Sequence, residues 1–266
     1  MEALLGWDSV FTGCGAAAEA VLILLLLRVR LFRTFPAFLV WVCFSFVNDI
    51  YFLAINYQNY QAPLRVFEIS TVVDSVLMFA VLVELAWSVL RPIRSSLPSY
   101  SWIAIVVLIL IAGTIVWFAA GLTFPVALTR EGRFFFRLQQ TGATLRVVVF
   151  LAMAGFSQLL SIGWRNRELQ IATGFGFYSI VSLAVTVLHT YQVPASPQYH
   201  WLDEAVGVSY IFALTYWVFA FATREAERKE FTPQMQSFLL AAAGSARAAR
   251  IGMASSPSGK SRKSGE

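Results

Sequence analysis

Three acidic side chains stand inside a stretch of the chain that is otherwise apolar. Residues 64–90 read LRVFEISTVVDSVLMFAVLVELAWSVL and carry Glu68, Asp74 and Glu84. Because successive residues of an α-helix turn by about 100°, Glu68 and Asp74 share one face and Glu84 points nearly the opposite way. An acid inside a membrane span costs at least a few kcal/mol unless it faces protein, water or a partner. We therefore predict a central helix with its acidic face turned into a bundle.

Polar side chains also occur inside four other apolar stretches. They are Glu19, Asn48, Asp49, Arg146 and Ser182. With a helical rise of about 1.5 Å per residue, Asp49, Asp74 and Arg146 fall at similar heights in the outer half of a bilayer. An unpaired guanidinium at that depth is untenable, so we expect Arg146 to pair with Asp74 or Asp49. The surplus carboxyl group is then protonated or free to bind a cation. The pattern predicts a polar cavity open to the outside, with Glu68 at its mouth.

The same residues also fit a structural interpretation. A single Arg–Asp pair can simply pin two helices together, and Arg146 can snorkel outward if its helix sits higher in the membrane. Glu19 can be a protonated acid bonded to neighbouring backbone. Glu84 is expected to reach Arg91 or the inner lipid headgroups. Hydroxyl groups such as that of Ser182 usually bond their own helix backbone.

Composition assigns the broad class. The 266 residues are 58% apolar and 13% charged, whereas a soluble domain carries about 25% charged residues. We predict an all-α, polytopic protein whose first partner is the lipid bilayer. Eight of the 20 Lys and Arg residues lie in 224–266, which is typical of a tail near anionic lipid and not of a nucleic-acid surface. Cys14 and Cys43 are expected to be free, buried thiols in different spans.

Seven apolar stretches are long enough to cross a membrane. They cover residues 10–27, 36–56, 64–90, 102–122, 135–164, 169–191 and 202–223. The predicted loops on one side, with the tail, hold fifteen Lys and Arg residues against four on the other. By the positive-inside rule the N-terminus lies outside and the C-terminus in the cytoplasm of a plasma or inner membrane. The almost purely aliphatic stretch 102–122 is expected to face lipid.

Outside the predicted membrane domain, 1–223, the segment 224–266 forms a cytoplasmic tail. Thr232 and Pro233 favour a helix start, and an apolar stripe follows. We predict a short amphipathic helix at about 233–251, lying on the membrane or frayed. From 254 onward the Ser, Gly, Pro, Lys and Arg composition predicts disorder.

Several sharper functions are excluded by missing residues. Residues 202–223 hold no Lys for a retinal Schiff base, and the two His residues do not form the HxxxH pattern of seven-helix zinc hydrolases. No serine, cysteine or metal constellation indicates an enzyme, and we expect no cofactor.

Two function classes remain. The first is a small-solute or ion transporter, proton-coupled through Asp74 or Asp49. The alternative is a ligand-sensing receptor or accessory subunit that signals through its tail or a partner. A purely structural membrane subunit is a third interpretation. The expected partners are an unknown small molecule or ion and either a second copy of the chain or another membrane protein.

Overall fold

The computed structural model describes residues 2–54, 61–89, 101–120, 130–155, 166–190 and 197–223. These residues form seven α-helices and one short 3-10 helix. The elements are α1 (Glu2–Arg28), η1 (Leu31–Arg33), α2 (Pro36–Ala54), α3 (Gln61–Val89), α4 (Ser101–Ala120), α5 (Arg130–Gly155), α6 (Arg167–Thr190) and α7 (Pro197–Ala222). The tail 224–266 lies outside the described residues, so its helix at 233–251 stays a prediction.

The prediction of an all-α, multi-pass membrane protein is confirmed. Six of the described helices are long and apolar enough to cross a membrane. Their apolar windows are Phe11–Arg28, Pro36–Ala54, Arg65–Val89, Trp102–Ala120, Arg167–Leu188 and Glu204–Ala222. The exception is α5, because the charged residues of its first turns and Arg146 lower its hydropathy.

The largest differences from the predicted bounds are at the starts of three helices. α1 begins at Glu2 instead of residue 10, and α7 begins at Pro197 instead of 202. α5 begins at Arg130 instead of 135, and residues 156–165 fall outside the described part of the chain. Hydropathy marks the apolar part of a helix, whereas the backbone ladder continues through polar residues beyond it.

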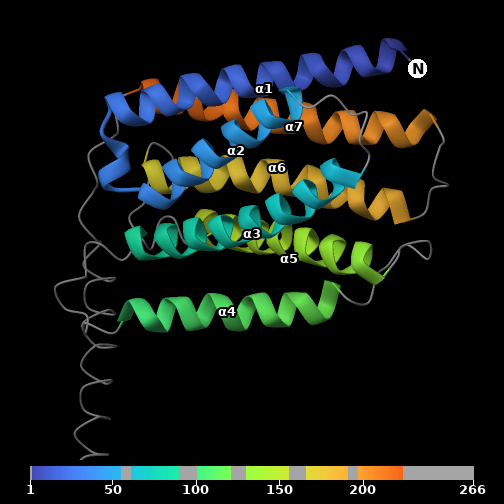
Figure 1. Cartoon of the computed structure of the whole chain (residues 1–266). Helices are drawn as coiled ribbons and strands as arrows, with labels where there is room; N and C mark the ends of the chain where they lie inside the picture. The colour runs from blue at the N-terminus through green and yellow to red at the C-terminus, as the bar shows by residue number, and fades with distance from the viewer. Residues whose placement is uncertain are drawn as a thin grey trace, which may run out of the picture.

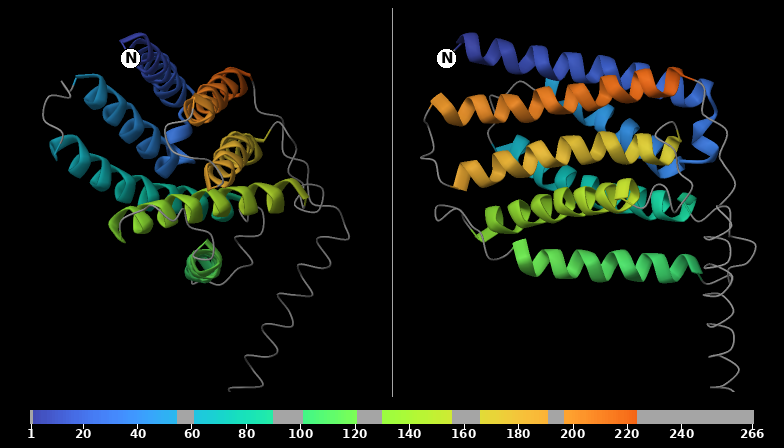
Figure 2. Two further views of the ribbon diagram at one scale, coloured as in Figure 1. Left: turned by 90° about the vertical axis from the view of Figure 1, so that its right-hand side faces the viewer. Right: turned by 180° about the vertical axis from the view of Figure 1, so that it is seen from behind.

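Six helices pack as a closed ring in the order α1, α2, α3, α5, α6 and α7, and α7 packs back against α1 (Figure 1). α4 lies outside this ring against α5 and α3, as both views in Figure 2 show. Large aliphatic side chains along α4 are exposed, Leu108 and Ile115 among them, which agrees with the expected lipid-facing surface. α3 is a ring member that packs against α2, α4, α5 and α6.

Aromatic rings fill the interior of the ring between α2, α6 and α7. We call Phe38, Trp41, Phe175 and Trp217 the aromatic core, and all four are buried. The centroids of Phe175 and Trp217 lie 4.8 Å apart, and those of Trp41 and Phe175 lie 4.9 Å apart, both in edge-to-face geometry. Such pairs add to the stabilisation from apolar burial.

Close packing in this core depends on a glycine. A Cβ atom at Gly174 would collide with the indole ring of Trp217. Without that atom the indole lies on the α6 backbone, and its Nε1 donates to the carbonyl oxygen of Gln170 at 3.2 Å.

The cysteine prediction is half right. Cys14 and Cys43 are both free, but Cys14 is exposed and Cys43 is only partly buried. The reason is helical phase: the buried side of α1 carries Gly15, Ala16 and Glu19, and Cys14 lies off that face.

Candidate functional site

A buried acid joins α1, α2 and α7. Glu19 is fully buried, and its Oε1 accepts a hydrogen bond from the hydroxyl of Tyr210. The hydroxyl of Ser45 lies 2.9 Å from the same tyrosine oxygen, and it is the donor there because the Tyr210 hydrogen is used on Glu19. Asp49 interacts electrostatically with Glu19 and Tyr210. A Cβ atom on Gly15 would sit 3.4 Å from Asp49 Oδ2, so this acid lies close to the α1 backbone.

A second acid joins α2 and α3 and lies near α5 and α6. The indole Nε1 of Trp41 donates to Asp74 Oδ1 at 2.8 Å. On the neighbouring helices, the guanidinium carbon of Arg146 lies 5.4 Å from the ring centroid of Tyr178. Tyr178 interacts electrostatically with both Arg146 and Asp74, so these groups belong to one cluster.

Two tyrosines connect the clusters. The rings of Tyr178 and Tyr210 meet edge-on, with centroids 5.4 Å apart. The connected side chains, which we call the polar tract, are Glu19, Trp41, Ser45, Asp49, Asp74, Arg146, Tyr178 and Tyr210. Each of the six ring helices contributes at least one of them, and α4 contributes none.

Three buried atoms in or next to the tract have no hydrogen-bond partner. They are Glu19 Oε2, Arg146 Nε and Ser179 Oγ. Ser179 directly follows Tyr178 in α6. Buried polar groups are nearly always paired, because an unpaired one loses its hydration without compensation. These atoms leave acceptor and donor capacity that a solute or water can use.

The tract brings together some of the predicted residues and not others. Glu19, Asp49, Asp74 and Arg146 all belong to it. Within the described residues, however, Arg146 forms no ion pair with either aspartate, since the ring of Tyr178 takes the place next to its guanidinium. The other predicted residues are partly buried and, in the described part of the chain, are not hydrogen-bonded into the tract: Asn48, Glu68 and Ser182.

The sequence reasoning missed Trp41, Tyr178 and Tyr210, which supply the polar links. A buried Tyr or Trp needs a partner for its O–H or N–H group. That rule was the available signal, but it does not say which acid each ring will meet.

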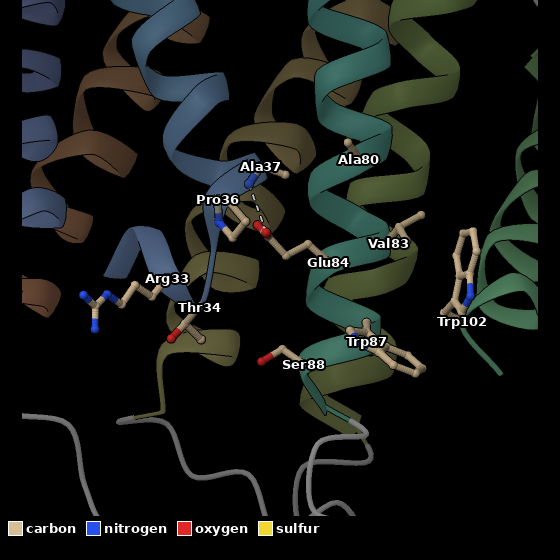
Figure 3. Close-up of a pocket in the computed structure, with 10 residues that line it drawn as sticks. All are labelled: Arg33, Thr34, Pro36, Ala37, Ala80, Val83, Glu84, Trp87, Ser88 and Trp102. Atoms are coloured by element: carbon tan, nitrogen blue, oxygen red, sulfur yellow. Dashed lines mark hydrogen bonds between the residues drawn. The ribbon is translucent and has the colours of Figure 1, made fainter. Parts of the chain in front are cut away.

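Glu84, near the C-terminal end of α3, accepts hydrogen bonds from the backbone of α2. Its Oε1 accepts from the N–H of Ala37 at 2.9 Å, and its Oε2 accepts from the N–H of Phe38 at 3.0 Å. Figure 3 shows the carboxylate turned toward the first turn of α2. Both carboxylate oxygens thus bond the main chain, because bare N–H groups at a helix start bind a carboxylate well. The expected contact of Glu84 with Arg91 or lipid headgroups stays a prediction, since Arg91 lies outside the described residues.

A cavity of about 530 Å³ adjoins this carboxylate. Its lining combines η1 and the start of α2 with the last turns of α3 and the first of α4, and comprises Arg33, Thr34, Pro36, Ala37, Ala80, Val83, Glu84, Trp87, Ser88 and Trp102. In Figure 3 the guanidinium of Arg33 points away from Glu84. Glu84 lies ten residues beyond Asp74, which is about 15 Å along α3. This cavity is thus separate from the polar tract.

The first turn of α6 is also tied to helix ends. Arg167 is buried and donates to the carbonyl oxygens of Ala220 and Thr223 at the end of α7, both at 2.7 Å. Beside it, the hydroxyl of Ser88 in α3 donates to Glu168 at 2.9 Å. We call Glu84, Ser88, Arg167 and Glu168 the capping region. Arg167, which was expected in a loop, is the first residue of α6, and it is held by the unpaired carbonyls that end every helix.

No protein-family model matches this sequence, and comparison with curated proteins and with solved structures likewise finds no match. The described residues contain no group of three or more His, Cys, Asp or Glu placed to hold a metal ion.

Proposed function

We propose that this protein is a membrane transporter for a small solute or ion and that the polar tract is its binding site. The observation that carries the proposal is that all six ring helices contribute to one connected set of polar groups, of which Glu19, Trp41 and Arg146 are buried and the others partly buried. Polar groups within membrane spans are costly, and they mark substrate and ion pathways. Bonds between neighbouring pairs would be enough to hold helices together, but the Ser45–Tyr210 bond joins α2 and α7, which are not adjacent in the ring, and so reaches across the interior.

The proposal includes α5 as a seventh span. This helix lies between α3 and α6 in the ring and has 26 residues, enough for about 39 Å. Its charged residues gather in its first turns, apart from Arg146, which faces the tract. Seven spans put the two ends of the chain on opposite sides of the membrane. The distribution of Lys and Arg favours an external N-terminus in a plasma or inner membrane.

The charges of the tract favour a cargo with a positive group, or one that moves together with protons. Glu19, Asp49 and Asp74 oppose the single cation Arg146. A carboxylate within the membrane needs a positive partner or a proton. Arg146 can neutralise one acid at most, so at least two of the three acids need a proton or a positive partner from outside the tract.

The first experiment is a thermal-shift screen of detergent-purified protein against ions, amino acids, sugars and nucleosides at two pH values. A ligand at a hundred times its dissociation constant stabilises a protein by about 2.7 kcal/mol, which is easily detected. We expect a stabilising ligand whose effect is lost in Asp74→Asn and kept in the control Glu68→Gln. The same ligand should then cross proteoliposome membranes containing the wild type and not those containing Asp74→Asn. Tight binding without flux would contradict transport and favour a receptor.

A further inference from the structure

We infer that Arg146 and Ser179 form a carboxylate-binding subsite in the polar tract, and that the cargo is a small zwitterion whose ammonium group faces the acids. This inference rests on the proposed function and names the substrate class of the same site. It starts from two buried donors, on α5 and α6, that the protein itself does not use.

Arg146 is the stronger of these donors. Its side chain is only 9% exposed, and its Nε has no hydrogen-bond partner. The ring of Tyr178 attracts the guanidinium through its π-electrons, but that contact does not satisfy N–H groups that point along the guanidinium plane. Arg137 on the same helix shows the usual arrangement, since it contacts the ring of Trp117 and also donates from Nε to the Trp117 carbonyl at 2.6 Å.

Ser179 is the second donor. It is 0% exposed, and its Oγ has no partner. Buried hydroxyls in helices normally bond the carbonyl four residues back, and Thr173 and Thr186 of the same helix do so. Ser179 lies one turn beyond Phe175, which packs in the aromatic core, so its side chain is directed into the ring of helices.

A guanidinium fork and a hydroxyl are the donors that bind a carboxylate in two-point geometry. A simple carboxylate would be repelled by Glu19, Asp49 and Asp74 at the same site. An ammonium group on the same solute removes that repulsion and supplies a donor for the unpaired Glu19 Oε2. A zwitterion therefore satisfies both kinds of unused atom, whereas an anion or a cation alone satisfies one.

The test uses linear ω-amino acids from glycine to 6-aminohexanoate, each compared with the amine and the carboxylic acid of equal length. Binding is measured by thermal shift and by calorimetry on the full-length protein. We expect one member of the series to bind at least about tenfold more tightly than its matched amine or acid. Arg146→Lys keeps the charge but not the fork and should weaken that member about tenfold or more, while leaving the amine unaffected. Arg137→Met is the matched control: it removes a guanidinium outside the tract and should leave the affinities for the amino acid and the amine unchanged.

Ser179→Ala covers the case in which the Arg146 variants fail to fold. It removes one hydroxyl and should weaken the best amino acid several-fold but not the amine. The inference is overturned if no member of the series binds, if the amine binds as well as the amino acid, or if both Ser179→Ala and Arg146→Lys bind the amino acid normally. An amine that binds alone and crosses the membrane would overturn the subsite and leave the transporter standing. An amino acid that binds but does not cross the membrane would overturn the transporter and leave the subsite standing.

Discussion

The capping region and the polar tract both bury charged side chains, but they use them differently. In the capping region, Glu84 accepts two backbone N–H groups of α2, and Arg167 donates to two carbonyl groups of α7. In the polar tract, side chains bond one another, and Glu19, Arg146 and the adjacent Ser179 keep unpaired atoms.

The difference follows from where each region sits along the helices. Helix ends expose N–H and C=O groups that no residue of the same helix satisfies. A charge placed there finds fixed partners in the main chain and holds the architecture. In the middle of a span the backbone N–H and C=O groups bond one another within the helix. A charged side chain there depends on other side chains or on a bound solute for its partners. The comparison is consistent with a structural role for the first region and with the proposed binding role for the second.

The largest effect is expected for Glu84→Ala. It leaves two N–H groups at the start of α2 without their acceptor, and we expect the free energy of unfolding to fall by about 3–4 kcal/mol. Thermal unfolding in detergent measures this loss, with Glu68→Ala on the same helix as the control. If Glu84→Ala and Glu68→Ala lowered the free energy of unfolding equally, the two bonds from Glu84 to α2 would not contribute to stability as proposed. At a temperature where Glu84→Ala is folded, its ligand-induced shift should equal that of the wild type.

Arg167→Met should cost somewhat less, about 2–3 kcal/mol, because it removes the guanidinium from two carbonyl groups at the end of α7, of which only that of Ala220 keeps another donor, the Thr223 hydroxyl. Arg167→Lys should recover part of the loss, since an ammonium can reach one carbonyl but lacks the planar fork. Arg133→Met, at an exposed position of α5, serves as the reference in the same unfolding assay. A lysine variant as stable as the wild type would show that the fork geometry is unimportant.

Gly174→Ala tests the aromatic core that lies between the two regions. The added methyl group must displace the Trp217 indole, at a cost of about 1–3 kcal/mol. Gly142→Ala is the matched control in a helix with open space around it, and it should be neutral or stabilise by up to about 1 kcal/mol. Near-ultraviolet circular dichroism, which reports tryptophan packing, should change only in Gly174→Ala. An unchanged spectrum there would remove the proposed close contact.

The smallest change in stability is expected for Tyr210→Phe. It deletes one hydroxyl that serves Glu19 and Ser45, for about 1 kcal/mol. Its effect on the ligand-induced thermal shift should nevertheless be large, because the hydrogen bonds from α7 to the tract residues of α1 and α2 are lost, while the ring contact with Tyr178 remains. Tyr216→Phe, on the same helix outside the tract, is the control. Ligand binding that survives Tyr210→Phe unchanged would break the assignment of binding to the tract.

Much of the fold could be predicted from hydropathy, since an uninterrupted apolar run in a membrane protein leaves few alternatives to a spanning helix. The outer position of α4 also follows from its sequence, which offers the bundle no charged group. α5 was harder to bound, because its charged start continues the helix without adding to the apolar signal.

The site was predictable only in part. Helical rise alone indicates that Asp74 and Arg146 reach comparable depths, and both lie near Tyr178. The rise does not reveal that a tyrosine ring stands beside the guanidinium. It also cannot predict that Glu84 and Arg167 bond main-chain atoms of other helices, because every residue has such atoms and the sequence does not mark which of them are left bare.

The aromatic core has a consequence for leakage. Trp41 bonds Asp74 with its indole, while the backbone of Phe38, one turn away, bonds Glu84. The rings of the core therefore stand between the polar tract and the capping region. A continuous chain of water molecules could conduct protons. The faces of these rings offer no hydrogen-bonding groups to such a chain. The packed rings therefore oppose a continuous chain of water between the polar tract and the capping region.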